Sequence, residues 1–427
     1  MKNVIGSVKG TRDFYPDEMS VRRWLLDTMR DVSSQFGYQE YDGPCVEKID
    51  LYAAKSGEEL VKEQSFVFPD RGGELIALRP ELTPTLARMI ANKQNELIFP
   101  LRWWSFGPFW RYERPQRGRS REFFQWNVDL IGTSNVESDA EVVAVAARFF
   151  ECVGLKSDQI KILVNNRRLM DKSLDKIGIP ESGRLAVFRL IDKIDKMSTE
   201  KWEAHALEIG LTSKQLEGLR TVLSNKSLWE ESEELRSFFK TVTWLGVEEY
   251  VRFEPHVIRG LDYYTGTVFE GRDEMRKFRA IFGGGHYDNL VADVGGNPLP
   301  GVGFAMGDVV IQLLLEEYCC IPDNVMDPPS VLVTVFDENT IGESYRTSTL
   351  LREAGLNVVT FPQVEKLGKQ FRFADRMGIR VVVVAGPDEL AVGKVMIKNL
   401  LTREQESVGI EQAANFIRSL LAQEMAL

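Results

Sequence analysis

The chain has 427 residues, of which 44% are hydrophobic and 27% are charged, and its formal net charge is -10. This length predicts two or three domains with a sizeable buried core, and the composition is that of an ordinary globular protein. The acidic balance excludes a protein that coats nucleic acid with a basic surface, but it leaves room for one local basic patch.

Histidine and cysteine usage argues against a metal centre and against a disulfide framework. The three histidines are scattered and the four cysteines show no CxxC spacing, so we expect no metal site and reduced cysteines. The N-terminal segment lacks the apolar core of a signal peptide, and no apolar run approaches the ~18 residues of a membrane helix. We therefore expect a soluble, cytoplasmic protein with no membrane contact.

In chain order, the first predicted element is an amphipathic helix at 17–36, which Gly37 ends. A strand is predicted directly after it, at 38–41. Residues 100–132 are rich in aromatic side chains and predict two long strands joined by a polar, arginine-rich connection. The next helix, at 137–153, has acidic residues in its first turn.

The composition changes in the second half of the chain. The stretch at 166–245 is rich in Lys, Glu and Leu and has a helical pattern, which predicts an inserted helical domain. Strand patterns return at 251–270, and 281–307 contains eight glycines. A linker rich in Pro and Asp at 321–330 precedes alternating strands and helices, which predict a small α/β domain with a mostly parallel sheet.

The strand at 123–132 carries the first chemical signal. Its side chains are apolar on one face and polar on the other: Phe124, Trp126, Val128 and Leu130 against Gln125, Asn127 and Asp129. The polar face of a central strand needs partners, which a ligand cavity would supply. A half-exposed sheet with a solvated polar face is the alternative, and this segment alone does not decide between them.

The connection before this strand is strongly basic. It holds five arginines and one glutamate, namely Arg111, Arg114, Arg117, Arg119 and Arg121 with Glu113. Because a guanidinium is a planar fork of donors that suits phosphate oxygens, the loop indicates a polyphosphate or nucleic acid ligand. A solvated hairpin turn is the alternative, but such a turn usually needs only one or two charges.

Other segments are compatible with a nucleotide site of unusual type. Glu81 and Thr83 lie beside two prolines, either in a rigid loop that meets a substrate ammonium or at a helix start with Thr83 as the cap. Residues 283–285 are glycines, which indicates backbone passing close to a ligand or a neighbouring strand. The chain has neither a GxGxxG fingerprint nor a P-loop, so any phosphate chemistry needs a different ATP site.

Taken together, the chain resembles the histidyl-tRNA synthetases, which are class II aminoacyl-tRNA synthetases. The segments that carry the resemblance are 10–16, 36–44, 109–132, 259–270, 283–290 and 366–390. It implies an α+β catalytic core at 1–325, an antiparallel sheet with flanking helices, interrupted by the helical insertion. It also implies an α/β anticodon-binding domain at 326–427, and a homodimer whose interface is built by 36–44.

The resemblance implies roles for individual residues. Arg111 and Arg259 would be catalytic, holding the α-phosphate of ATP and the carboxylate of histidine. ATP would be bound by Arg111, Glu113 and Arg119. Histidine would be bound by Glu81, Thr83, Arg111, Gln125, Asp129, Arg259, Tyr263 and Tyr264, with Asp129 and Tyr264 on the imidazole nitrogens.

The implied reaction has two steps, in which L-histidine and ATP give histidyl-adenylate and the histidine is then passed to the 3′ end of tRNA(His). Mg²⁺ would enter with ATP and not through a protein cage. Arg114 and Gln116 are the candidates for contacting the acceptor end of the tRNA.

Several positions depart from the family pattern. The third class II motif usually has a glutamate and an adenine-stacking arginine, where this chain has Val309 and Val310. Adenine must therefore be held differently, for example by another nearby arginine. His286 and Asn289 stand where arginine and glycine are common, and Asp129 stands where many bacterial members carry glutamate.

Two alternatives compete with an active ligase. One is a paralogue that kept the fold as a regulatory subunit of histidine biosynthesis. Such paralogues usually lack the C-terminal domain and the Arg259 signature, and this chain keeps both. The other is a non-catalytic module that senses tRNA; the missing third-motif arginine favours it, and the intact phosphate-binding arginines argue against it.

Overall fold

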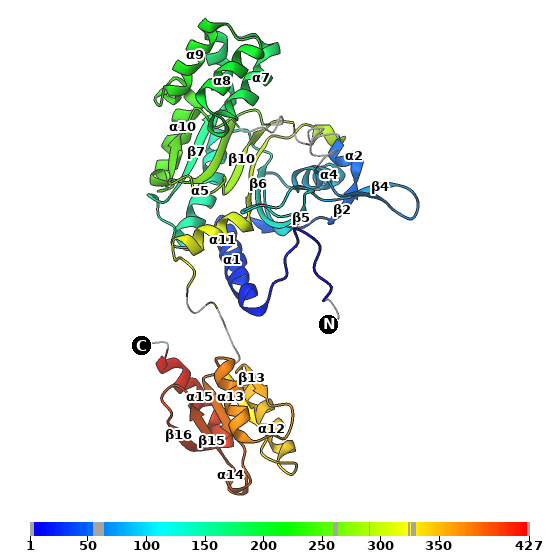
Figure 1. Cartoon of the computed structure of the whole chain (residues 1–427), viewed down its shortest axis with the longest axis vertical. Helices are drawn as coiled ribbons and strands as arrows, with labels where there is room; N and C mark the ends of the chain where they lie inside the picture. Colours follow the sequence, from blue (N-terminus) through cyan, green and yellow to red (C-terminus); the bar gives the residue numbers. More distant parts are fainter. Residues whose placement is uncertain are drawn as a thin grey trace. The chain divides into compact units, whose positions relative to one another are not determined.

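A computed structural model describes residues 4–53, 64–258, 264–289, 291–322, 325 and 330–424. It divides into two compact units, Met1–Pro322 and Asp323–Leu427 (Figure 1).

An eight-stranded sheet forms the centre of the first unit, in the order β1-β5-β6-β11-β10-β9-β7-β8. Its inner pairs, from β5/β6 to β9/β7, are antiparallel, and the outer pairs β1/β5 and β7/β8 are parallel. The strands are β1 (Gln39–Glu40), β5 (Leu101–Trp110), β6 (Glu122–Ile131), β7 (Ile160–Asn166), β8 (Val251–Phe253), β9 (Thr267–Asp273), β10 (Phe282–Tyr287) and β11 (Gly301–Gly307). The predicted antiparallel sheet is confirmed.

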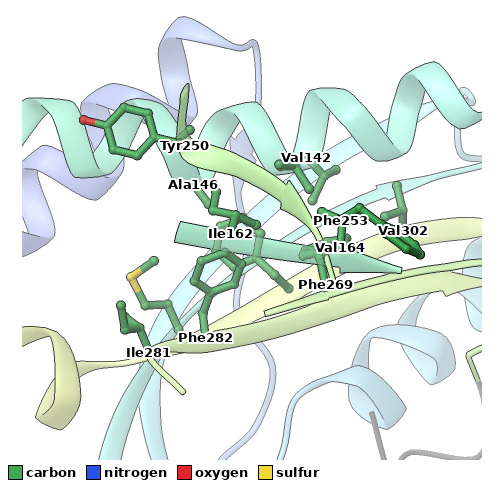
Figure 2. Close-up of a cluster of buried hydrophobic side chains, with 14 of the residues drawn as sticks. Val142, Ala146, Ile162, Val164, Tyr250, Phe253, Phe269, Ile281, Phe282 and Val302 are labelled. Atoms are coloured by element: carbon green, nitrogen blue, oxygen red, sulfur yellow. The ribbon is translucent and has the colours of Figure 1, made fainter. Parts of the chain in front are cut away.

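Three helices cover one face of this sheet: α1 (Pro16–Gln35), α5 (Val136–Cys152) and α11 (Asp308–Glu317). The core lies between them and the sheet, because Trp126, Val128 and Leu130 of β6 are buried there, as the alternation along this strand predicts. Figure 2 shows part of this core, with Val142 and Ala146 of α5 above Phe269 and Phe282 of the sheet. The polar side chains of β6 therefore point to the opposite face.

The opposite face carries a smaller layer. A three-stranded sheet in the order β2-β4-β3 is formed by β2 (Val46–Lys48), β3 (Val67–Pro69) and β4 (Leu75–Leu78). The helices α2 (Ile49–Ala53) and α4 (Thr83–Lys93) lie beside it, and α4 packs its apolar side chains against the large sheet through Leu86 and Ala87.

The stretch after β7 is helical. It contains α6 (Arg167–Lys176), α7 (Glu181–Ile191), α8 (Thr199–Glu208), α9 (Ser213–Ser224) and α10 (Glu233–Trp244), with short 3₁₀ turns η1 (Ile194–Lys196), η2 (Leu228–Glu231) and η3 (Glu248–Tyr250). A further 3₁₀ turn, η4 (Ala292–Val294), follows β10. In Figure 1, α7, α8 and α9 cluster together while α10 runs alongside α5.

The second unit has a five-stranded sheet in the order β13-β12-β14-β15-β16. The strands β12 (Val331–Thr334), β13 (Val358–Thr360) and β14 (Val381–Val384) are parallel, whereas β15 (Lys394–Asn399) and β16 (Gln405–Gly409) add antiparallel pairs. The helices are α12 (Ile341–Glu353), α13 (Leu367–Arg376), α14 (Pro387–Ala391) and α15 (Ile410–Glu424). The expectation of a mostly parallel sheet is wrong, because β15 and β16 follow one another without an intervening helix and pair antiparallel.

Candidate functional site

The large sheet has one face against the main core, and its other face carries glycines on adjacent strands. Gly285 of β10 and Gly303 of β11 pair in register. A Cβ atom on Gly303 would lie 2.1 Å from Oδ1 of Asp129, and one on Gly285 would lie 2.8 Å from Cδ1 of Tyr264. Larger residues would therefore collide with the two side chains predicted to hold an imidazole, so the glycines leave room for both side chains on this face of the sheet.

Asp129 forms the buried end of this face. Its side chain is almost fully buried, and it accepts a hydrogen bond of 3.1 Å from the hydroxyl of Tyr287. Burial raises the pKa of Asp129 to about 7, although the hydrogen bond from Tyr287 opposes this shift. Tyr264 is also buried and packs with Tyr287 in one apolar cluster. A carboxylate between phenols offers complementary partners to a small ring that carries N–H groups.

The shifted pKa of Asp129 gives a stability prediction. Because the folded state holds this proton up to about pH 7 and an unfolded aspartate releases it near 3.8, wild-type stability should fall as pH rises between these values. Asp129→Asn removes this titration. Between pH 5 and pH 8, the melting temperature of wild type should therefore fall by a few degrees relative to that of the variant. Thermal unfolding at both pH values measures this, and a difference that does not change with pH would contradict the shift.

A cavity of about 730 Å³ lies over the same sheet face. Four of the predicted site residues line it, namely Arg111, Glu113, Arg119 and Gln125. Phe123 also lines it, and the Arg111 guanidinium carbon lies 5.3 Å from the centre of that ring. An aromatic face beside several guanidinium groups can bind a flat base together with phosphates.

The arginine-rich connection at 111–121 folds as a hairpin. Gln116 and Arg119 exchange backbone hydrogen bonds of 3.0 and 2.8 Å at its tip. Arg119 forms an ion pair with Glu113 inside the cavity, while Arg114 and Gln116 are exposed. The hairpin therefore presents one set of polar groups to the cavity and another to solvent.

Two arginines of this hairpin pack against aromatic rings. The Arg121 guanidinium lies 4.2 Å from the centre of the Tyr112 ring and donates a 3.1 Å hydrogen bond to the Glu113 carbonyl. Arg117 lies over the ring of Phe278 at 5.5 Å. The alternative interpretation, a solvated hairpin turn, therefore does not describe these two arginines.

Glu81 and Thr83 lie on the segment that leads into α4. Nε of Arg111 donates a 3.0 Å hydrogen bond to the carbonyl of Pro80, which brings this segment against Arg111. Glu81 is buried. Thr83 is the first residue of α4 and Leu82 occupies the cap position, so the expectation that Thr83 caps the helix is wrong by one residue.

The predicted residues do not all meet at one surface. Among the described residues, the lining of the cavity does not include Glu81, Thr83, Asp129 or Tyr264. Asp129 lies on the same face of β6 as Gln125, which lines the cavity, but four residues further along the strand. Arg259 and Tyr263 lie outside the described residues. Arg114 and Gln116 lie at the exposed tip.

Sequence reasoning missed Tyr287, Phe123 and Arg279. Tyr287 could have been predicted from the sequence, because it shares a strand face with Gly283 and Gly285. These glycines already indicated that this face lies close to a ligand or a neighbouring strand. Phe123 sits on the polar face of β6, where only the polar residues drew attention. Arg279 lies in the loop between β9 and β10 and has no periodic signal, yet it lines the cavity.

His286 turns away from this site. Its Nδ1 lies 2.8 Å from Asp139 on α5 and its Nε2 lies 3.3 Å from Asp288. Burial acts to lower the pKa of His286, but the hydrogen bond and charge of Asp139 outweigh it, and the pKa is raised. This histidine therefore ties β10 to α5 beneath the sheet.

Two further properties bear on the class of protein. In the described ranges, no group of three or more His, Cys, Asp and Glu side chains is arranged to hold a metal ion. None of the described helices is both long enough and apolar enough to span a membrane.

Comparison with known proteins gives the family. The family described as Histidyl-tRNA synthetase matches residues 10–308, and the Anticodon binding domain family matches residues 330–420. The chain belongs to the histidyl-tRNA synthetase family. Its match within this family covers both the sheet that carries Asp129 and the arginine-rich hairpin.

Individual relatives agree along nearly the whole length. The chain is 38% identical to the chloroplastic/mitochondrial histidine–tRNA ligase of Arabidopsis thaliana, over 94% of this chain and 84% of the relative. It is also 38% identical to the histidine–tRNA ligase of Halobacterium salinarum, over 94% and 95% of the two chains. A crystal structure of histidyl-tRNA synthetase from Nostoc sp. PCC 7120 superposes with a TM-score of 0.82 at 27% identity, covering 98% of this chain and all of that one.

Proposed function

We propose that this chain is a histidine–tRNA ligase. It activates L-histidine with ATP to histidyl-adenylate, releases pyrophosphate, and transfers the histidine to the 3′ end of tRNA(His) for protein synthesis. The observation that carries the proposal is one sheet face that joins a buried carboxylate and phenols to a cavity lined by guanidinium groups. The experiment that tests it is attachment of radiolabelled histidine to tRNA(His) by the purified chain, with no labelling expected from other amino acids.

The imidazole of histidine is assigned to Asp129 and Tyr264. Because both side chains are buried, a substrate without matching N–H and N groups would leave them unpaired, which is costly. Tyr287 holds Asp129 by its hydroxyl. Glu81, Thr83 and Gln125 are assigned to the α-amino group of histidine. Their carboxylate, hydroxyl and amide oxygens can accept hydrogen bonds from its N–H groups.

The reacting groups are assigned to the arginines. Arg111 lines the cavity and is fixed through its bond to Pro80, so its remaining donors can hold the α-phosphate and offset charge that develops during transfer. Arg259 is assigned the same task from the resemblance. Arg119 and Glu113 are assigned to ATP, and Phe123 offers a face on which adenine can stack.

Mg²⁺ is proposed to enter with ATP. Among the described residues, the carboxylates of Glu113, Asp195, Glu254 and Glu270 line the cavity and already pair with a basic side chain; the fifth carboxylate of the lining is Asp192. This donor set fits a metal that is held mainly by the triphosphate, with at most one or two carboxylates from the protein. When bound, the ion offsets the negative charge of the phosphates.

The tip of the hairpin is proposed to contact the acceptor end of the tRNA. Replacing Arg114 and Gln116 together by alanine should lower kcat/KM for tRNA about tenfold, because one charge-assisted contact is lost. Both side chains are exposed and outside the cavity lining, so tRNA-independent ATP–pyrophosphate exchange should stay within about twofold of wild type. Steady-state aminoacylation and exchange measure the two effects, and parallel losses in both would contradict the assignment.

The domain roles follow the same proposal. Residues 1–325 form the catalytic domain, with a helical insertion at about 166–245, and residues 326–427 bind the anticodon. We also propose a cytoplasmic location, which the four free cysteines support.

A homodimer is proposed from the resemblance of residues 36–44 to an interface motif. The three-stranded sheet supports it, because Val67, Phe68 and Leu75 expose apolar surface there. Sedimentation equilibrium should give twice the chain mass, and a monomer at micromolar concentration would contradict the dimer.

A further inference from the structure

Six basic side chains among the described residues line the cavity, and four of them already have a carboxylate partner. The ion pairs are Arg119–Glu113, Arg272–Glu270, Arg276–Asp195 and Lys277–Glu317. Within the described part of the chain, Arg111 and Arg279 have no such partner. Arg111 is instead fixed by the Pro80 carbonyl. Arg279 therefore brings a guanidinium to the cavity whose donors are all available.

Arg279 lies where the phosphates of ATP are expected. Its loop, 274–281, ends at Phe282, which pairs in register with Met306 near the end of β11. The next residue of β11, Gly307, pairs with Gln125 of β6, close to the arginine-rich hairpin. The loop and the hairpin thus leave the sheet at the same end and border the same cavity.

The charges around Arg279 favour an anion beside it. Burial lowers the pKa of Arg279, the nearby charge of Arg119 lowers it further, and Glu113 opposes both effects. Two guanidinium groups that repel each other lie near one carboxylate, that of Glu113, which already pairs with Arg119. A polyanion placed between them would remove this repulsion, whereas an uncharged base would not.

The first turn of α11 supplies no cation to the cavity. Val309 and Val310 line it instead, and a Cβ atom on Gly118 of the hairpin would lie 3.8 Å from Cγ2 of Val310. Position 310 therefore brings an apolar side chain to the part of the cavity beside the hairpin. In this chain, that region receives its positive charge from the loop between β9 and β10.

We propose that Arg279 is a substrate-binding residue that, together with Arg119, holds the β- and γ-phosphates of ATP and the pyrophosphate product. The inference rests on the proposed function and names a residue of the loop between β9 and β10 for the phosphate end of ATP.

The test is ATP–pyrophosphate exchange with the purified full-length chain and its Arg279→Gln variant. The variant should raise the KM for pyrophosphate and the KM for ATP about tenfold or more, because it loses a charge-assisted contact. The KM for histidine and the inhibition constant of adenosine should stay within about twofold. The matched control is Arg252→Gln, because Arg252 pairs with Glu274 of the same loop at 2.9 Å but lies outside the cavity lining, so its KM values should stay within about twofold of wild type. The second variant, Arg279→Lys, should recover part of the affinity for pyrophosphate, because it restores the positive charge without the planar guanidinium fork.

Three results would overturn the inference while leaving the proposed function intact. The first is an active wild type with an Arg279→Gln variant whose KM values for ATP and pyrophosphate are unchanged. The second is a variant in which adenosine affinity falls as much as ATP affinity, which would place Arg279 at the base. The third is an equal rise in the KM for histidine, which would indicate a general distortion. Absence of exchange in the wild type would instead overturn the proposed function itself.

Discussion

Replacing Asp129 by alanine is expected to raise the KM for histidine in ATP–pyrophosphate exchange on the order of 100-fold, while the KM for ATP changes less than about threefold. The reason is that Asp129 is buried at the end of the sheet face, where its carboxylate can accept an imidazole N–H but does not line the cavity assigned to ATP. Titration of each substrate at saturation of the other gives both constants.

The control for this experiment is Glu141→Gln. Glu141 is a carboxylate on α5 that pairs with Arg102 at 2.8 Å, outside the cavity lining and on the helix-covered side of the sheet. This variant should keep both KM values within about twofold, because it contacts neither substrate. An Asp129→Ala variant that loses affinity for ATP and histidine equally would contradict the imidazole role.

Replacing Arg111 by alanine is expected to lower kcat of exchange by on the order of 10²- to 10³-fold, because the site loses a positioned donor group where charge develops. Arg111→Lys should recover little, since an ammonium cannot reproduce the planar fork of a guanidinium. Pre-steady-state formation of histidyl-adenylate measures the chemical step directly.

The matched control is Arg148→Ala, which removes an exposed arginine of α5 that pairs with Glu151 at 2.6 Å. Its kcat should equal that of wild type. Circular dichroism of Arg111→Ala should also match wild type, because Arg111 is only partly buried and its loss leaves no unpaired charge in the core. An Arg111→Ala variant with nearly wild-type kcat would remove this arginine from the mechanism.

The main sheet was predictable wherever local pattern and tertiary burial agree. In β6, apolar and polar side chains alternate from Phe124 to Leu130, so its two faces could be assigned before the fold was known. In β15 one face carries Lys394 and Lys398, and the antiparallel pairing of this strand with β14 and β16 depends on contacts that periodicity does not report.

The site was predictable in its residue types but not in its geometry. The arginine cluster identified the hairpin, yet the sequence could not distinguish Arg119, which faces the cavity, from Arg121, which packs on Tyr112. The environment of Asp129 depends on Tyr287, which lies 158 residues away in the chain. Arg279 was missed because only the sheet register places its loop beside the hairpin.

Histidine-dependent ATP–pyrophosphate exchange by the purified full-length chain tests the central claim most directly. We predict rapid exchange with Mg-ATP and histidine, and at least about 10³-fold less with other amino acids, because a buried site built on hydrogen bonds rejects side chains that leave them unpaired. Absence of exchange at saturating histidine and Mg-ATP would contradict the assignment of this sheet face as an adenylate-forming site.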